Sequence, residues 1–403
     1  MNLSLPVQRE VLDLLNERHS LFEADIERCG QELEQAVRKG RFLVIGGAGS
    51  IGRAVVRELF KRKPSALHVV DLSENNLVEL VRDLRSSLGY FDGDFRTFAL
   101  DVISPVFDAM FHREGPYDYV LNLAAMKHVR SEKDPYTLMR LLEINILGTM
   151  KTVDLAAAAG ASKYFSVSTD KAAAPASLMG ASKRVMELAL MRDNLAVPVS
   201  TARFANVAFS DGSLLHGFTQ RLRNRQPISA PLDIQRYFVT QREAGELCLL
   251  SCLQGRARDI FFPKESEQMR LIYLHEIAVS FLETHGYEPV LCESEEEARG
   301  RAAELIAMQK WPCYFFVSDT SGEKPYEEFF LPGDSLDLAR FESIGVIHHP
   351  EFAAKANLDL FVEKLEALRH GRQWSKADIV TLLQALVPEL SHIETGQNLD
   401  NRM

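Results

Sequence analysis

The chain has 403 residues, of which 46% are hydrophobic and 25% charged, and its formal net charge is −10. This length allows one large domain with an additional lobe, or two domains. The acidic balance argues against a broad nucleic-acid-binding surface, because such surfaces need clustered Lys and Arg to bind phosphates. It does not exclude a nucleotide ligand, which needs only a few local donors.

The sequence carries no sign of a targeting or metal-binding segment. Its first residues include acidic side chains and lack an apolar run before a cleavage site, so no signal peptide is predicted. The longest apolar runs, such as LCLLSCL, are far too short to span a membrane. Five scattered cysteines suit a reducing compartment. Cys248 and Cys252 lie four apart on one face of a predicted helix, but no further His or Cys is spaced to complete a metal site with them. We therefore expect a cytoplasmic protein with no membrane span, no bound metal and no nucleic-acid partner, and we expect Cys248 and Cys252 to pack in the core.

Two helical stretches precede the first strand and make up an N-terminal extension, residues 1–40. The first covers residues 7–18 and the second residues 20–39, where Ser20 and Glu23 are spaced as a capping box. Apolar residues recur at helical spacing along the second stretch. Such a stripe needs a surface to cover it, which is either the main domain or another subunit, and both alternatives remain open.

From residue 41 to residue 206 short apolar strands alternate with helices. The strands are FLVIGG, ALHVVD, FRTFALD, YDYVLNLAA, KYFSVSTD and VPVSTARF, and helices are predicted at about 51–63, 74–88, 135–159 and 178–195. This alternation predicts an α/β fold with a doubly wound parallel sheet, the Rossmann arrangement, with ligands at the carboxyl ends of the strands.

The order is less regular after residue 206. We expect residues 207–370 to form a smaller substrate-binding lobe, with strands exchanging between the two parts, and a helix near residues 243–253. Residues 371–403 read as a short amphipathic helix capped by Ser375, followed by a polar tail that is expected to be disordered.

A glycine-rich turn follows the first strand of this domain. Gly46, Gly49 and Gly52 lie three apart between a strand and a helix, with Ser50 and Ile51 inside the turn. Glycine is needed there because the turn is tight, the backbone must approach a pyrophosphate, and the helix N-terminus offers free N–H groups to the anion. The sequence therefore predicts a dinucleotide site.

Acidic and small residues at the ends of the next strands complete this predicted site. Asp71 ends the second strand, where a carboxylate accepts hydrogen bonds from the adenosine ribose and repels a 2′-phosphate, which favours NAD over NADP. Asp101 and Val102 end the third strand and are expected to flank the adenine. Ala124 is small enough for the middle of the cofactor to lie against the fourth strand.

Several motifs in matching order resemble a known family. They are GGAGSIG, NLAAMKHV, NILGT, VSTDKAAAPASLMGASKR, ARFANVAFSDGS, RYFVT and SGEKPYEEFF, and they cover about residues 41–347. Together they are similar to the extended short-chain dehydrogenases that are nucleotide-sugar 4,6-dehydratases, and above all to the UDP-N-acetylglucosamine 4,6-dehydratases of bacterial polysaccharide synthesis. Members of that family carry either Tyr or Met at the position of Met179, so Met179 does not by itself imply an inactive enzyme. Met126 and Arg130 depart from the usual pattern.

The resemblance implies a retained NAD, oxidation at C4 of the sugar, loss of water across C5 and C6, and return of the hydride to C6. It implies that Asp170 and Lys171 are the acid and base. Thr169 and Ser168 would line the sugar and Lys183 would hold the nicotinamide ribose. The residues implied to reach the substrate and its diphosphate are Lys127, Asn206 and Arg236. We expect Met179 to pack against the nicotinamide or sugar, and we expect a homo-oligomer.

In other short-chain dehydrogenases a tyrosine handles the proton of the alcohol that is oxidised, and Met179 stands at its position here. Asp170 and Lys171 are the groups expected to handle the protons of the reaction instead. Neighbours on an extended chain point to opposite sides, so the backbone must turn there if both serve the sugar. Keeping a resting Asp protonated beside a neutral Lys inverts their reference pKa values and costs roughly 9 kcal/mol. Our hypothesis is that Asp170 starts ionised, accepts the O4 proton and later delivers it to the departing O6, while Lys171 takes the C5 proton.

Two other functions remain open from the sequence. A nucleotide-sugar epimerase would also oxidise C4 but would return the hydride there, and it would not need the Asp170 and Lys171 pair. A regulatory protein that binds NAD or a sugar nucleotide without catalysis is the alternative from a different class.

Overall fold

The computed structural model describes residues 19–193, 195–266, 269–350 and 355–394. Within them, one large sheet is made of the strands β1 (Arg41–Ile45), β2 (Ala66–Asp71), β3 (Asp94–Ala99), β4 (Tyr119–Asn122), β5 (Lys163–Thr169), β6 (Val199–Phe204), β11 (Asp259–Pro263), β15 (Leu336–Asp337) and β16 (Ile344–His348). Their order across the sheet is β15-β16-β11-β6-β5-β4-β1-β2-β3.

The first six strands of this sheet are parallel and run in the order 3-2-1-4-5-6. β11 adds to them in parallel, and β16 and β15 close the edge antiparallel. This is the doubly wound order, so the predicted Rossmann fold is confirmed. Because the strand order reverses between β1 and β4, a ligand is expected beside their carboxyl ends.

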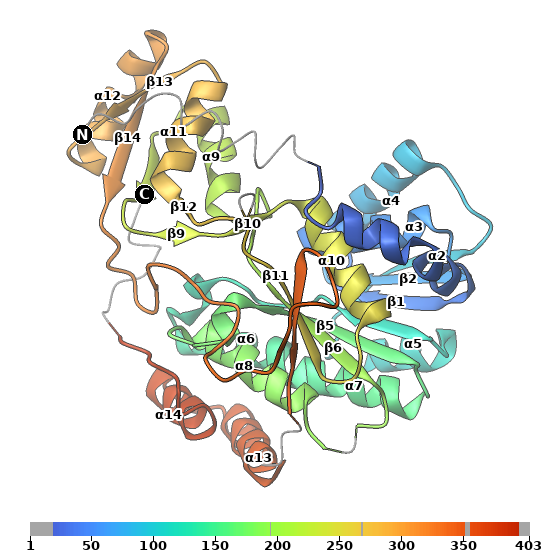
Figure 1. The fold of residues 1–403 in the computed structure, drawn as a ribbon. Helices are drawn as coiled ribbons and strands as arrows, with labels where there is room; N and C mark the ends of the chain where they lie inside the picture. Colours follow the sequence, from blue (N-terminus) through green and yellow to red (C-terminus); the bar gives the residue numbers. More distant parts are fainter. Residues whose placement is uncertain (1–18, 194, 267–268, 351–354, 395–403) are drawn as a thin grey trace.

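Helices cover both faces of the sheet (Figure 1). One face carries α2 (Glu23–Lys39), α3 (Ser50–Lys61), α4 (Glu74–Leu88) and α10 (Gln241–Gln254), and the other carries α5 (Pro105–Glu114), α6 (Pro135–Leu142), α7 (Thr149–Ala158) and α8 (Leu178–Leu190). Most strands between these layers are buried along nearly their whole length, as in β1, where residues 42–45 are buried, whereas the edge strand β3 is partly exposed. α5 was not predicted, although Ser104 caps it and Pro105 starts it.

The helix predicted over 135–159 contains a π-helical turn, Glu143–Gly148, between α6 and α7. Asn145 lies in this turn and is fully buried. Its Oδ1 accepts a hydrogen bond from Met126 N, and its Nδ2 donates to Met126 O and to Ser182 Oγ, each at 3.0 Å. The widened turn thus holds the loop that follows β4, and π-helical turns are frequent beside functional sites.

The second N-terminal helix packs on the chain's own main domain, which settles the alternative for that helix. The apolar residues Phe22, Cys29, Leu33 and Val37 are buried in the main core, beside α10. The capping box was wrong: α2 begins at Glu23, its N-cap residue is Phe22 rather than Ser20, and it has no side-chain cap. The Ser20 hydroxyl donates to Glu246 of α10. The helix predicted over residues 7–18 lies outside the described residues, and the homo-oligomer stays a prediction.

Asp25 joins α2 to residues 342–343, just before β16, and replacing it should lower the stability of the fold. Its side chain is 1% exposed, and its two oxygens accept hydrogen bonds from Glu342 N at 2.7 Å and Ser343 N at 2.9 Å. Asp25→Ala leaves both amides without these acceptors, so we expect a loss of about 2–3 kcal/mol in the free energy of unfolding, measured by urea denaturation. Glu27→Ala, on the exposed side of α2, is the control and should be nearly neutral.

A smaller lobe follows residue 206. It contains the strand pairs β7 (Asn206–Val207) with β10 (Phe238–Val239) and β9 (Gln235–Arg236) with β12 (Ile272–Tyr273), the sheet of β8 (Ile228–Pro231), β13 (Glu288–Leu291) and β14 (Lys310–Phe316), and the helices α9 (Leu214–Arg223), α11 (Leu274–Thr284) and α12 (Glu295–Ala307). Phe218, Phe281 and Trp311 belong to its separate core. α10 and β11 interrupt this lobe and belong to the main domain. After β14 the chain returns to the large sheet with β15 and β16.

The last two described helices are α13 (Lys355–Gly371) and α14 (Lys376–Leu386), which pack on α6 and α8. Ser375 caps α14 as predicted and forms a capping box with Asp378. Residues 395–403 of the predicted tail lie outside the described residues.

Among the residues that the structure describes, no helix is long and apolar enough to cross a membrane. All five cysteines are buried and free, and Cys248 and Cys252 pack in the main core as predicted.

Candidate functional site

The glycine turn after β1 is built as a tight cradle. Gly46 has φ +73°, and a Cβ there would lie 2.5 Å from Ala124 N, so only glycine fits. A Cβ at Gly52 would lie 2.2 Å from the carbonyl oxygen of Gly46. Because glycine has no Cβ, the start of α3 can pack closely against the glycine turn. At Gly49 the nearest atom would be 3.8 Å away. The chain's own packing therefore does not require Gly49, and the space above it is free for a ligand.

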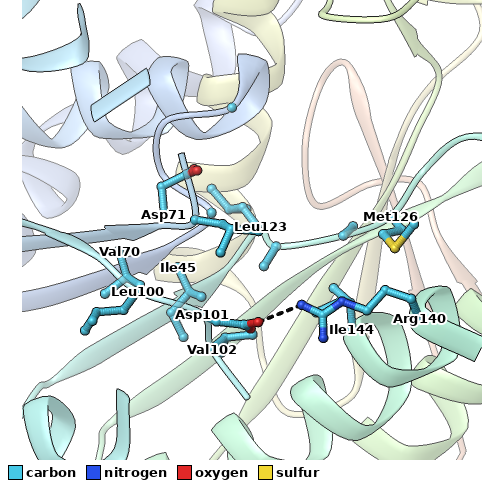
Figure 2. A pocket seen from close by; sticks show the side chains of 15 residues that line it. Ile45, Val70, Asp71, Leu100, Asp101, Val102, Leu123, Met126, Arg140 and Ile144 are labelled. Atoms are coloured by element: carbon cyan, nitrogen blue, oxygen red, sulfur yellow. Dashed lines mark hydrogen bonds and ion pairs between the residues drawn. The ribbon is translucent and has the colours of Figure 1, made fainter. Parts of the chain in front are cut away.

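A pocket of about 270 Å³ opens beside this turn, at the carboxyl ends of β1 to β4 (Figure 2). The predicted cofactor residues that line it are Gly46, Gly49, Asp71, Asp101, Val102 and Ala124. Ser50, Ile51 and Gly52 do not line this pocket and lie in the first turn of α3. The Ser50 hydroxyl accepts a hydrogen bond from Asp211 N at 2.8 Å, which links the turn to the smaller lobe.

Asp71 is fixed between the glycine turn and the end of β2. Its Oδ2 accepts a hydrogen bond from Ala48 N, and its Oδ1 accepts one from Ser73 N, both at 2.9 Å. Each carboxylate oxygen keeps a further lone pair for a ligand hydroxyl. The carboxylate is therefore held in one orientation at the pocket wall.

Arg140 closes the far side of the same pocket and was missed in the sequence (Figure 2). Its guanidinium pairs with Asp101 at 2.7 Å and with Glu143 at 2.9 Å. Burial opposes the charge of Arg140, but these carboxylates outweigh it and raise its pKa. Its position in the helix after β4 was the available signal, since that helix starts near the carboxyl edge of the sheet.

The chain turns immediately after β5, as the pairing of Asp170 with Lys171 required. Residues Asp170–Ala172 form a 3₁₀ turn, and Asp170 is 3% exposed. Its Oδ1 accepts hydrogen bonds from Thr169 Oγ1 at 2.8 Å, from Lys171 N at 2.8 Å and from Lys171 Nζ at 3.2 Å. The turn thus brings the predicted acid and base into contact.

Glu327 is a further member of this cluster that sequence reasoning did not assign. Its Oε1 lies 3.5 Å from Lys171 Nζ, and its side chain is buried. Burial raises the pKa of Glu327, Lys171 lowers it, and the charge of Asp170 raises it again. The motif SGEKPYEEFF contains Glu327, but the motif alone does not say which of its carboxylates reaches the lysine.

Lys183 and Met179 lie on α8, the helix that follows the turn Asp170–Ala172. Lys183 is buried, its Nζ donates to Val167 O at 3.0 Å, and burial lowers its pKa to about 8. Met179 is 4% exposed and belongs to the apolar cluster of α6, α8 and the C-terminal helices. Its backbone N donates to Glu132 Oε1 at 2.8 Å, and burial raises the pKa of this carboxyl group. Glu132, also missed in the sequence, thus holds the start of α8.

The structure does not bring every predicted substrate residue to an open surface. The Ser168 hydroxyl is buried and donates to Glu187 at 2.7 Å. Arg236 is also buried, and its guanidinium donates to the carbonyl oxygens of Lys324 and Pro325. Asn206 begins β7, where its N donates to Tyr237 O. Their predicted contacts with substrate stay predictions.

Lys127 lines a second, larger pocket of about 790 Å³, directly after the loop residue Met126 that lines the first. Basic groups from two elements share this pocket, namely Lys127, His128, Arg130, Lys133 and Arg221, with Glu323 opposite in charge. Burial lowers the pKa of Lys127, whose Nζ lies 3.4 Å from Ser210 Oγ. The pocket is therefore suited to an anionic ligand.

The loop between the turn Asp170–Ala172 and α8 forms hydrogen bonds with the last described residues of the chain. Ser391 N donates to Pro175 O at 3.0 Å, and His392 Nδ1 donates to Ala176 O at 3.2 Å. Glu394 accepts a hydrogen bond from Ser321 Oγ at 3.3 Å, at the start of the loop that carries Glu327. The C-terminal segment thus ties together two loops of the site.

Comparisons with known proteins show which proteins the chain is similar to. A family model described as polysaccharide biosynthesis protein matches residues 42–349. An uncharacterised membrane protein of Methanocaldococcus jannaschii is 28% identical over 327 residues, 79% of this chain and 88% of that protein. A capsular polysaccharide biosynthesis protein of Staphylococcus aureus is 27% identical over 371 residues, 88% of this chain and 55% of that protein. The inverting UDP-N-acetylglucosamine 4,6-dehydratase of Campylobacter jejuni is 26% identical over 236 residues, 56% of this chain and 67% of that protein.

Solved structures share the fold. Pen from Bacillus thuringiensis superposes with a TM-score of 0.64 at 23% identity, covering 78% of this chain and 89% of that one. The dTDP-glucose 4,6-dehydratase DesIV from Streptomyces venezuelae, solved with NAD bound, has a TM-score of 0.56 at 18% identity and covers 73% of this chain and 92% of that one. With its doubly wound sheet, its glycine turn and a family match over residues 42–349, the chain belongs to the polysaccharide biosynthesis protein family of extended short-chain dehydrogenases.

Proposed function

We propose that this chain is an NAD-dependent nucleotide-sugar 4,6-dehydratase that acts on UDP-N-acetylglucosamine or a close relative. The observation that carries the proposal is the contact of Asp170 with Lys171 on the turn after β5. An elimination of water needs one group to remove a proton from carbon and another to protonate the leaving oxygen, and this pair offers both. An epimerase has no use for it. Family membership and the similarity to the Campylobacter dehydratase support the assignment.

The residues around the smaller pocket fit a dinucleotide. The turn Gly46–Gly52 would hold the pyrophosphate, Asp71 would accept hydrogen bonds from the ribose, and Asp101 with Val102 would flank the adenine. The free space above Gly49 is what a ligand that approaches the backbone requires. When bound, NAD supplies the oxidising capacity at C4 and returns the same hydride at C6.

Gly49→Ala tests the cofactor assignment without disturbing the fold. Gly49 has φ −75° and ψ 173°, which alanine adopts freely, and no atom of the chain lies closer than 3.8 Å to the added Cβ. We expect the free energy of unfolding to change by less than about 1 kcal/mol and the dissociation constant for NAD, measured by calorimetry on cofactor-stripped protein, to rise about tenfold or more.

Gly52→Ala gives the contrasting case, because its Cβ would collide with the Gly46 carbonyl at 2.2 Å. This variant should lose both stability and cofactor. Unchanged NAD affinity in the Gly49→Ala protein would place the cofactor elsewhere.

Asp170 is suited to handle the proton of the sugar hydroxyl. The donors Thr169 Oγ1, Lys171 N and Lys171 Nζ converge on its Oδ1 and hold the carboxyl group in one orientation. As an ionised carboxylate it accepts the O4 proton during oxidation and then delivers that proton to O6 as the hydroxyl departs as water. The proton moves within one site, so the missing tyrosine is not needed.

Lys171 removes the C5 proton and later returns a proton to C5. It must be neutral when it acts as a base. Lys183 lies on α8, and its buried Nζ donates to Val167 O near the end of β5, just before the turn that carries Lys171.

The larger pocket is the proposed site of the nucleotide diphosphate. Its cationic side chains, Lys127, Arg130, Lys133 and Arg221, come from the loop after β4 and from α9. Two phosphate groups placed there would meet several donors, while the sugar would extend toward Asp170.

The proposal is tested by mixing the purified protein with UDP-N-acetylglucosamine, without added cofactor, and following the sugar nucleotide by mass spectrometry and proton NMR. Loss of one water together with a new C6 methyl signal supports dehydration with a retained NAD. An isomer of unchanged mass, obtained with NAD and a panel of nucleotide sugars, would favour an epimerase. No reaction across the panel would favour a non-catalytic binding protein.

A further inference from the structure

Lys171 lies between two carboxyl groups that come from different parts of the chain. Its Nζ is 3.2 Å from Asp170 Oδ1 and 3.5 Å from Glu327 Oε1. Asp170 is 3% exposed and Glu327 is 5% exposed, whereas the Lys171 side chain keeps 19% of its surface open. A single catalytic lysine therefore faces two buried acids, of which the proposed reaction has so far used one.

The loop that carries Glu327 is fixed by two buried arginines of the core. Arg236 donates to the carbonyl oxygens of Lys324 at 2.9 Å and Pro325 at 3.1 Å, on one side of Glu327. Arg203 donates to Phe329 O at 2.7 Å on the other side. The Glu327 carboxylate is thus held against Lys171 from both directions, which a side chain that merely fills space would not need.

We propose that Glu327 is a positioning residue whose carboxylate is the counter-ion of the ammonium that Lys171 becomes when it takes the C5 proton. The inference rests on the proposed function. In that reaction Asp170 already carries the O4 proton when the C5–H bond breaks, so Asp170 is neutral and cannot balance the new charge. The C5–H electron pair forms the C5–C6 double bond, the C6–O bond breaks, and the hydroxyl leaves as water with the proton of Asp170. Glu327 remains as the anion in contact with Lys171.

The charges around Glu327 favour this timing. Burial, the largest influence, and the charge of Asp170 raise the pKa of Glu327 overall, while Lys171, Arg236 and Lys324 oppose this rise. When Asp170 accepts the O4 proton, its repulsion of Glu327 disappears. The Glu327 carboxylate is therefore most favoured at the step at which Lys171 becomes charged. The buried Arg203 also interacts with Asp170, whose negative charge helps to raise the pKa of Arg203.

Glu327→Gln tests the proposal, with UDP-N-acetylglucosamine as the probe and the protein as purified. Reduction of the bound nicotinamide on mixing should stay within about twofold of wild type, because C4 oxidation does not involve Glu327. Exchange of the C5 hydrogen with deuterium oxide should slow about 10- to 100-fold, because the ammonium loses its counter-ion. The rising limb of the pH profile should move to lower pH by on the order of one unit, since Lys171 is then easier to deprotonate.

Two further variants separate charge from structure. Glu327→Asp keeps the charge and should return the pH limb to its wild-type position with part of the exchange rate, and it carries the test if the Gln protein does not fold. Glu328→Gln is the matched control, because its carboxylate is half-exposed and lies 3.9 Å from Lys324 Nζ instead. It should behave as wild type in both half-reactions.

Other outcomes overturn the proposal in distinguishable ways. If wild type shows neither nicotinamide reduction nor C5 exchange, the proposed function fails and the role of Glu327 fails with it. If wild type shows both and Glu327→Gln matches it, only the role of Glu327 is wrong. If Glu327→Gln loses both half-reactions equally while Glu327→Asp restores neither, Glu327 has a purely structural part.

Discussion

Asp170→Asn is expected to fold normally and to lose the ability to oxidise the sugar. The amide can accept the same hydrogen bonds at Oδ1 from Thr169 and Lys171, so the turn should survive. It cannot take the O4 proton, however, and the loss of a positioned proton acceptor lowers kcat by about 10²- to 10⁴-fold. The measurement is the near-ultraviolet absorbance of reduced nicotinamide after UDP-N-acetylglucosamine is added, which should show no signal.

The result is specific to the step. Asp83→Asn, on the exposed side of α4, is the control and should reduce the cofactor as wild type does. If the Asp170→Asn protein accumulates bound reduced nicotinamide, or exchanges the C5 hydrogen with solvent, oxidation uses another base and the proton route through Asp170 is wrong.

Glu187→Gln is expected to have the largest effect on stability. Glu187 is fully buried, and its oxygens accept hydrogen bonds from Arg203 Nε at 2.9 Å, Arg203 Nη2 at 2.7 Å and Ser168 Oγ at 2.7 Å. The substitution leaves the charge of Arg203 buried without its partner, which costs about 3–5 kcal/mol. Urea denaturation at neutral pH measures the loss. Glu389→Gln, an exposed partner of Arg184, should cost no more than about 1 kcal/mol.

The same pair predicts how stability depends on pH. Burial alone would raise the pKa of Glu187, but the Arg203 guanidinium outweighs burial and lowers it to about 2 from an ordinary 4.5. Because the unfolded chain binds this proton more readily, the contribution of Glu187 is fully present above about pH 4.5 and is lost as the pH falls toward about 2. The difference in stability between wild type and Glu187→Gln should therefore shrink over that interval. A constant difference would mean that the pair is not the cause.

The sequence predicted the layers of the fold because local patterns determine them. The helix expected over residues 74–88 is α4, and the parallel strands follow from short apolar runs between helices. The π-helical turn within 135–159 could not be foreseen, since it depends on Asn145 finding the backbone of Met126 across the fold. The capping box at Ser20 failed because α2 begins only at Glu23, so that Ser20 lies before the N-cap residue, and its hydroxyl binds Glu246 across the fold.

The candidate site divides in the same way. Gly46, Asp71 and the Asp170–Lys171 pair stand in contiguous motifs whose spacing carries their meaning, and the structure places them at the carboxyl edge of the sheet. Arg140 lies in the helix after β4 and Glu327 lies in the motif SGEKPYEEFF, but neither segment shows by its spacing which charged side chain reaches the site. Whether a charged side chain turns toward the site is decided by tertiary contacts, which spacing along one chain does not encode.

The hydrogen bond from His392 to Ala176 joins positions that are 216 residues apart in the order of synthesis. During synthesis the glycine turn and the turn Asp170–Ala172 are made long before residues 391–394, which contact the loop between the second turn and α8. The strands of the parallel sheet precede these residues in the chain, and the carbonyl oxygens of Pro175 and Ala176 lack these two donors until then. The loop of Pro175 and Ala176 can therefore form these two hydrogen bonds only after residues 391 and 392 have been synthesised.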